Sequence, residues 1–202
     1  MKLLNRLLRS ERAASAAEFA LVLPLLLLLL FGIIDAGRFM WEYNQAEKAT
    51  QMGVRYAVVT DPVLNGLYNY SFSVSGGITQ GSAVPTTSFD TATCTNGACT
   101  CNPSGGFCTA TSYNGAAFTN LVTRMNQMYP QVAASNVQIQ YKNVGLGFAG
   151  DPDGPDVSPL VTVSLTGLQF QPITCLVFAC SITMPDFRAA LTLEDATGSE
   201  SN

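Results

Sequence analysis

The sequence predicts an α+β protein in which a long N-terminal helix packs on a small antiparallel sheet domain with disulfide-bonded loops. Residues 19–34 form an unbroken apolar run, which is too long for a strand and indicates a helix. Residues 137–144 and 160–166 alternate apolar and polar side chains, as half-buried strands do. All six cysteines follow the apolar run, and an even number in an exported domain rich in small residues favours disulfides.

The composition excludes several classes of function. The chain has 202 residues, a net charge of −4 and only 12% charged residues. This acidic balance argues against a nucleic-acid partner. Histidine is absent, which excludes catalytic triads and dyads that use it and histidine-ligated zinc. An enzyme would depend on carboxylates such as Asp151 and Asp153, and no set of catalytic roles can be assembled. We therefore expect no enzyme, no cofactor and no small-molecule substrate.

The apolar run is long enough to cross a membrane. Residues 13–34 carry one charge, Glu18, and as a helix they would span roughly 33 Å. The sixteen residues after Glu18 would span only about 24 Å. Lys2, Arg6, Arg9 and Arg12 precede the run, opposed only by Glu11, so the N-terminus should be cytoplasmic. We predict a single-pass protein of the bacterial inner membrane, with a cytoplasmic basic leader at 1–13 and a transmembrane segment at 14–34.

Two simpler interpretations of this segment remain open. A cleaved secretory signal would have an unusually long apolar region, and the first cleavage site, around residues 35–37, would have Ile34 instead of a small residue at position −3. An uncleaved anchor needs nothing beyond the apolar run itself.

Glu18 is the most informative residue of the segment. A carboxylate within a membrane helix costs about 2.5–3.5 kcal/mol on insertion scales, so it normally has a partner. If the chain is cut between Ala13 and Ala14, the new amine of one subunit can be neutralised by Glu18 of its neighbour. The alternative is a glutamate that marks the headgroup boundary.

The residues around Glu18 carry a family resemblance. The stretch from Arg12 to Pro24 contains small residues, Glu18-Phe19 and a proline in the apolar run, and Gly32–Arg38 closes it with an acidic-small-Gly-Arg motif. It resembles the TadE-like family, minor pilins or pseudopilins of the tight-adherence (Tad) pilus. The resemblance covers about residues 10–55 and returns weakly at 182–194. Position −1 is Ala13, where glycine is usual.

The resemblance implies a pilin-like protein without catalytic residues. It implies cleavage by a prepilin peptidase between Ala13 and Ala14, with Glu18 and Phe19 at the subunit-assembly position. Its partners would be the inner membrane, other minor pilins and the Flp-type major pilin. The function implied is assembly or priming of a Tad/Flp-type pilus, with a C-terminal domain that is periplasmic, or extracellular within a pilus. The alternative is an uncleaved, single-pass, membrane-anchored periplasmic module with a structural or adhesive role.

The helix is expected to continue outside the membrane through residues 35–61 as a spine, because Asp61-Pro62 is its first stop signal. Small residues recur along one face and permit close packing against a partner, against the protein's own sheet, or against both on successive stretches: Ala46, Ala49, Gly53 and Ala57.

The exported α+β domain should occupy residues 62–195. The patterns predict a strand at 68–74, a turn-rich cysteine region, a helix at 115–129 closed by Pro130, and a last strand at 187–193. Residues 196–202 are polar and are expected to be a disordered tail.

The cysteines are Cys94, Cys99, Cys101, Cys108, Cys175 and Cys180. Cys175 and Cys180 lie close enough to pair locally, which would leave two bridges within 94–108, but six cysteines allow fifteen pairings. Free buried thiols and a metal site are the alternatives. Asp151, Asp153 and Asp156 surround a turn and offer oxygen ligands for a hard cation such as calcium. Their spacing is not that of an EF-hand, and an exposed acidic turn is the interpretation we favour.

Overall fold

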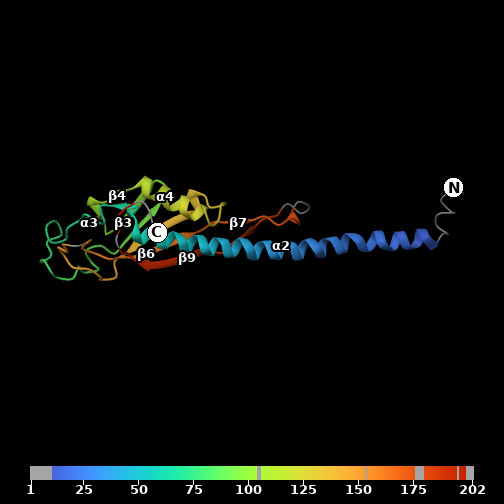
Figure 1. Ribbon diagram of the computed structural model, residues 1–202, viewed down its shortest axis with the longest axis horizontal. Coiled ribbons are helices and arrows are strands. Elements are labelled where there is room, and N and C mark those ends of the chain that lie inside the picture. The colour runs from blue at the N-terminus through green and yellow to red at the C-terminus, as the bar shows by residue number, and fades with distance from the viewer. Residues whose placement is uncertain (1–10, 104–105, 153, 176–179, 195, 199–202) are drawn as a thin grey trace. The chain divides into compact units, whose positions relative to one another are not determined.

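The computed structural model describes residues 11–103, 106–152, 154–175, 180–194 and 196–198, with side chains from residue 15 onward. Its main helix, α2, runs from Glu11 to Val59 and includes Pro24 (Figure 1). The prediction of one long N-terminal helix on an antiparallel α+β domain is confirmed. The chain divides into two compact units, which we call the anchor unit (residues 1–42 and 169–182) and the sheet unit (residues 43–168 and 183–202).

The sheet unit is built on five antiparallel strands in the order β3-β2-β5-β6-β9. The strands are β2 (Thr91–Thr95), β3 (Ala98–Asn102), β5 (Val137–Lys142), β6 (Leu160–Leu165) and β9 (Phe187–Thr192). β5 and β6 lie where the alternating patterns predict strands, and β9 lies at the last predicted strand, residues 187–193. In β5 the apolar residues Val137, Ile139 and Tyr141 are buried, whereas Gln138 and Gln140 between them are partly exposed, so one face of the strand forms core.

Short elements complete the fold. A 3₁₀ turn, η1, covers Ala134–Asn136, and the short helix α3 covers Phe107–Ala110. β1 (Leu64–Asn65) pairs with β4 (Ser112–Tyr113). β7 (Gln169–Phe170) and β8 (Ile182–Thr183) form a separate two-stranded sheet.

The second part of α2 packs inside the sheet unit. Its small residues Ala46, Ala49, Gly53 and Ala57 are all buried. A Cβ built on Gly53 would lie 2.9 Å from the Met125 side chain and 3.4 Å from Val163 of β6. Met125 belongs to α4 (Gly115–Asn126), the helix expected at 115–129. These small residues therefore pack against the protein's own sheet and helix.

The strand predicted at residues 68–74 is wrong, because this segment forms turns. Its aromatic side chains pack in a cluster, and its backbone pairs with no strand. The Phe72 ring stacks on Phe107 at a centroid distance of 5.6 Å, and Tyr70 meets both rings edge-on. The alternation that suggests a strand places Tyr70 and Phe72 on a common side, and this cluster uses that pattern without any strand partner.

The cysteine region holds a β-hairpin that sequence reasoning missed. β2 and β3 are joined at Asn96-Gly97, where Gly97 has a φ of 97°. Asn-Gly between two extended segments is a strong hairpin signal, and here Gly97 adopts the positive φ that a glycine accepts without strain, whereas Asn96 does not. The three disulfides expected from six cysteines are present, and the pairs are Cys94–Cys99, Cys101–Cys108 and Cys175–Cys180.

Residues 196–198 are held in place, contrary to the expected disordered tail. The Gly198 N–H donates to the Asp61 carboxylate at 2.8 Å, and the Asp61 N–H donates to the Gly198 carbonyl at 2.7 Å. Ala196 is buried. The backbone of Gly198 thus pairs with Asp61, two residues past the end of α2. Residues 199–202 lie outside the described part of the chain.

Tyr141 provides a test of this core. Its buried hydroxyl oxygen accepts the Val63 N–H at 2.9 Å. Burial raises the pKa of Tyr141 far above 10.0, although hydrogen bonds from the Val63 and Leu64 backbone act in the opposite direction. Above about pH 10 the unfolded chain therefore loses this proton while the folded chain retains it, and stability falls as pH rises.

We expect Tyr141→Phe to cost about 1–2 kcal/mol at neutral pH, because the Val63 N–H loses its acceptor. Phenylalanine has no proton to lose, so the stability of the variant should fall less steeply above about pH 10 than that of the unaltered protein. Urea unfolding followed by near-UV circular dichroism at neutral and alkaline pH checks both effects. Tyr68→Phe, at a partly exposed tyrosine, is the control. An unchanged alkaline slope in Tyr141→Phe would contradict the assignment.

Candidate functional site

The apolar part of α2 carries its side chains on the surface. The stretch from residue 15 onward contains a segment long and apolar enough to cross a membrane, and none of that segment is buried within the chain. Phe19, Leu25 and Ile33 are among the exposed apolar residues. A single such helix near the N-terminus suggests one membrane anchor, since these side chains would otherwise face water.

The residues assigned to processing and assembly lie together at the start of α2. Ala13 and Ala14 are within its helical backbone, although their side chains lie outside the described part. The Glu18 and Phe19 side chains are exposed, and no ion pair among the described residues involves Glu18. Four residues separate Ala14 from Glu18, or about one helical turn and 6 Å of rise. An amine at Ala14 would therefore lie close to the level of this carboxylate.

Asp35 is the first polar residue after the apolar run, and a distant segment binds it. The Ile173 N–H donates to Oδ1 of Asp35 at 2.7 Å, and the Thr174 N–H and hydroxyl donate to Oδ2 at 3.0 and 2.9 Å. The carboxylate is buried. Three donors and a nearby guanidinium compensate for the loss of water around this charge. We call Asp35 with residues 170–175 the clamp; Figure 1 shows this segment, in orange, alongside α2.

Arg38 extends the clamp one helical turn further. Its guanidinium lies 3.5 Å from both Asp35 and Glu42, and it donates to the Gln171 carbonyl at 3.4 Å. It also lies over the Phe170 ring, 5.4 Å from the centroid. The Phe39 ring meets Phe170 edge-on at 5.4 Å. Polar and aromatic contacts thus hold one face of α2 against the end of β7 and the residues that follow it.

The Cys175–Cys180 disulfide closes the segment that begins in the clamp. Cys175 directly follows Thr174, so the bridge restrains the donors that bind Asp35. Sequence reasoning predicted this local pair but not the clamp. The available signal was the first carboxylate after the apolar run, and its partner Thr174 lies 139 residues away.

The acidic turn is organised by hydrogen bonds within the protein. Asp156 is buried, and its carboxylate accepts the Phe72 N–H at 2.6 Å and the Asp151 N–H at 3.0 Å. Asp153 lies outside the described residues. Across the described ranges, no three of the metal-binding residue types form a group. The prediction that the whole turn is exposed is wrong for Asp156. Its carboxylate is buried and accepts hydrogen bonds from the backbone of two different loops.

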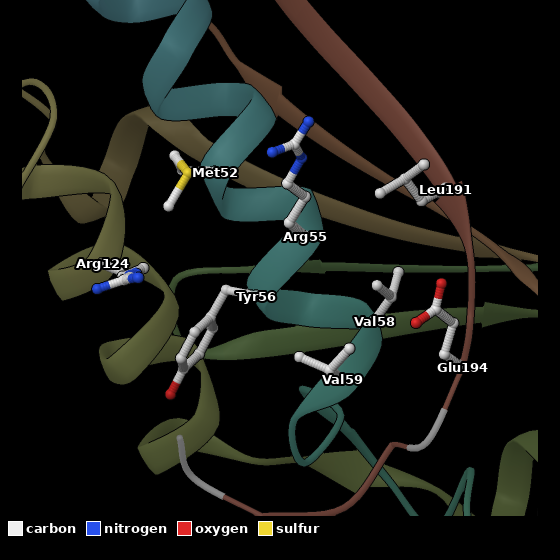
Figure 2. Close-up of a pocket in the computed structure, with 8 residues that line it drawn as sticks. All are labelled: Met52, Arg55, Tyr56, Val58, Val59, Arg124, Leu191 and Glu194. Carbon is white, nitrogen blue, oxygen red and sulfur yellow. The ribbon is translucent and has the colours of Figure 1, made fainter. Parts of the chain in front are cut away.

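A pocket of about 290 Å³ lies in the sheet unit between the end of α2, α4 and the segment after β9. Figure 2 shows Arg55 of α2, Arg124 of α4 and Glu194 around it, with Met52, Tyr56 and aliphatic side chains. The Nε atom of Arg124 is buried and has no hydrogen-bond partner among the described residues. The pocket lies at the lower limit of small-molecule sites, which occupy about 300–1,000 Å³, and we assign no ligand to it.

Comparison with known proteins bears on the N-terminal segment alone. No curated protein and no solved structure matches the chain. Residues 13–55 match the family model described as TadE-like protein, which confirms the resemblance seen in the sequence around Glu18.

Proposed function

We propose that this chain is a minor pilin, or pseudopilin, that acts in assembly or priming of a Tad/Flp-type pilus. The observation that carries the proposal is the match of residues 13–55 to the TadE-like family, on a helix, Glu11–Val59, that contains the expected cleavage site. This assigns a structural role without an enzymatic activity. The membrane segment anchors the subunit before assembly, and the sheet unit is exported.

The proposed cycle begins with insertion in the bacterial inner membrane, with the N-terminus in the cytoplasm and the C-terminal domain in the periplasm. A prepilin peptidase cuts between Ala13 and Ala14. The new amine and Glu18 then lie about one turn apart in each chain. Pairing between amine and carboxylate of neighbouring subunits relieves the cost of Glu18 in the membrane, which favours docking on other minor pilins or the Flp-type major pilin.

The disulfides support export. Three bridges form only where the environment is oxidising, as the bacterial periplasm is. All six cysteines lie after residue 35, on the side of the membrane opposite the basic leader. The charge argument and the cysteine argument thus use different residues and give the same orientation.

Intact mass and N-terminal sequencing of the protein from its native membranes test this function. We expect a chain that begins at Ala14. Ala13→Phe should abolish cleavage and leave Met1 in place, because prepilin cleavage requires a small residue at that position. Ala20→Phe, in the exposed apolar part of α2, is the matched control and should be processed normally. A native chain that begins at Met1 would instead favour an uncleaved, membrane-anchored structural or adhesive module.

A further inference from the structure

Beyond the clamp, α2 has two different faces. Asp35, Arg38 and Glu42 recur at three- and four-residue spacing and share one face. Residues 170–175 contact Asp35 and Arg38 on this face, and Arg38 also lies 3.5 Å from Glu42. The opposite face contains Ile33, Gly37, Met40 and Trp41. Ile33 is 65% exposed and Trp41 66% exposed, and no atom of the described residues lies within 4 Å of a Cβ built on Gly37. This uncovered face carries no charge.

The uncovered face continues the apolar surface of the membrane segment. Leu26, Leu30 and Ile33 are exposed and precede Gly37 and Trp41 at helical spacing. Beyond Arg38, whose side chain is 41% exposed and lies over the Phe170 ring on the clamp side, the next exposed charges along α2 are Glu47 and Lys48. An aqueous boundary at Asp35 would therefore leave a tryptophan and a methionine in water directly beside the bilayer, although tryptophan prefers the membrane–water interface.

The length of the apolar segment also indicates that the bilayer boundary lies beyond Asp35. The sixteen residues from Phe19 to Ile34 span about 24 Å, which is shorter than the roughly 30 Å hydrocarbon core. The stretch from Phe19 to Trp41 has twenty-three residues and spans about 34 Å. Asp35 is the only acidic residue within it, and the clamp satisfies its carboxylate with three donors.

We propose that the face formed by Ile33, Gly37, Met40 and Trp41 lies against lipid at the exported side of the membrane, with Trp41 at the interface. The clamp then shields Asp35 from lipid and allows the bilayer surface to lie near Trp41 instead of at Asp35. The occupant of this face is the lipid interface, because the face is continuous with the membrane-crossing surface. This inference rests on the proposed membrane anchoring.

Trp41 is the single tryptophan of the chain, so its fluorescence reports this position directly. The experiment uses the full-length protein in phosphatidylcholine–phosphatidylglycerol vesicles, with lipids brominated near the headgroup or near the end of the acyl chain. We expect Trp41 to be protected from iodide and to be quenched more strongly by the shallow bromines than by the deep ones. Two calibrators in a Trp41→Phe background define the limits. Leu27→Trp reports the middle of the span, and Phe148→Trp reports an exposed position of the sheet unit, where Phe148 is 57% exposed.

The calibrators separate the possible failures. If Leu27→Trp is quenched by lipid while Trp41 behaves like Phe148→Trp, the anchor stands and this inference is wrong. If Leu27→Trp is also unquenched, the membrane anchoring itself fails. If Trp41 is protected from iodide but no brominated lipid quenches it, protein covers the face, as a second copy of the chain would, and the lipid assignment is overturned.

The role of the clamp needs its own variants. Thr174→Pro removes both Thr174 donors to Asp35 and should reduce the lipid quenching of Trp41 by about twofold, because the unshielded carboxylate is drawn toward water. Thr174→Val removes only the hydroxyl and should change the quenching much less. Asp35→Ala added to Thr174→Pro should restore the quenching, since no charge remains to shield. Failure of this rescue would show that Thr174→Pro acts through misfolding and would overturn the shielding role.

Discussion

Replacing Asp156 with alanine should lower the free energy of unfolding by about 3 kcal/mol. The variant removes a buried carboxylate that accepts the N–H groups of Phe72 and Asp151. Both donors would lose a charge-assisted hydrogen bond, and the Phe72 amide would be left buried without an acceptor. The aromatic cluster next to it would lose its fixed backbone, because Phe72 stacks on Phe107.

Urea unfolding in mild detergent, together with hydrogen exchange at the Phe72 and Asp151 amides, measures this effect. Asp156→Asn retains one acceptor oxygen, so its free energy of unfolding should lie between those of Asp156→Ala and the unaltered protein. Asp186→Ala is the matched surface control, because Asp186 is about half exposed and only 3.8 Å from Arg188 in a surface ion pair. It should change stability by less than about 0.5 kcal/mol. Equal urea midpoints for Asp156→Ala and the unaltered protein would contradict the argument.

Glu18→Gln should reduce incorporation of the protein into pili by at least about thirtyfold, if the proposed function is correct. Glutamine has nearly the same shape but no charge, so it cannot neutralise the Ala14 amine of a neighbouring subunit. Loss of one partner of a desolvated ion pair costs about 2–5 kcal/mol, much of it from the charge left alone. The substitution also makes the membrane segment more apolar, so insertion should not suffer.

The measurement is the amount of protein in sheared pili from a strain that carries only the variant gene. Amounts in the membrane and the mass of the processed chain are determined in parallel, so that a defect in assembly is distinguished from a defect in export. Glu11→Gln is the matched control, since Glu11 lies in the leader that cleavage removes. Normal pilus incorporation of Glu18→Gln would remove the ion pair from the proposed mechanism.

Local patterns predicted the elements whose structure depends on local signals. The apolar run and Asp61-Pro62 placed the helix within a few residues, because helix periodicity and a proline stop are written in neighbouring residues. The strands β5 and β6 followed from alternation over six residues. The segment 68–74 shows the same alternation but pairs with nothing, since its rings pack in a cluster and Asp156 takes the Phe72 N–H. A strand needs a partner, and the pattern alone does not supply one.

The candidate site was predictable where chemistry is local and unpredictable where it depends on the tertiary fold. Glu18 stands out because a charge in an apolar run is expensive wherever the chain folds. Asp35 gives no comparable signal, because its donors come from residues more than 130 positions away. The buried state of Asp156 was missed for the same reason, since its partner Phe72 is 84 residues distant.

The disulfides also determine how one margin of the sheet is protected. β3 is an edge strand, paired only with β2 in the five-stranded sheet. Cys99 of β3 is bonded to Cys94 of β2, and Cys101 of β3 is bonded to Cys108 of α3. Edge strands invite pairing with other chains, and here two covalent bonds fasten the edge to its own fold. Recombinant protein made in a reducing cytosol would lack both covalent bonds to this strand, so samples for structural work should be produced in an oxidising compartment.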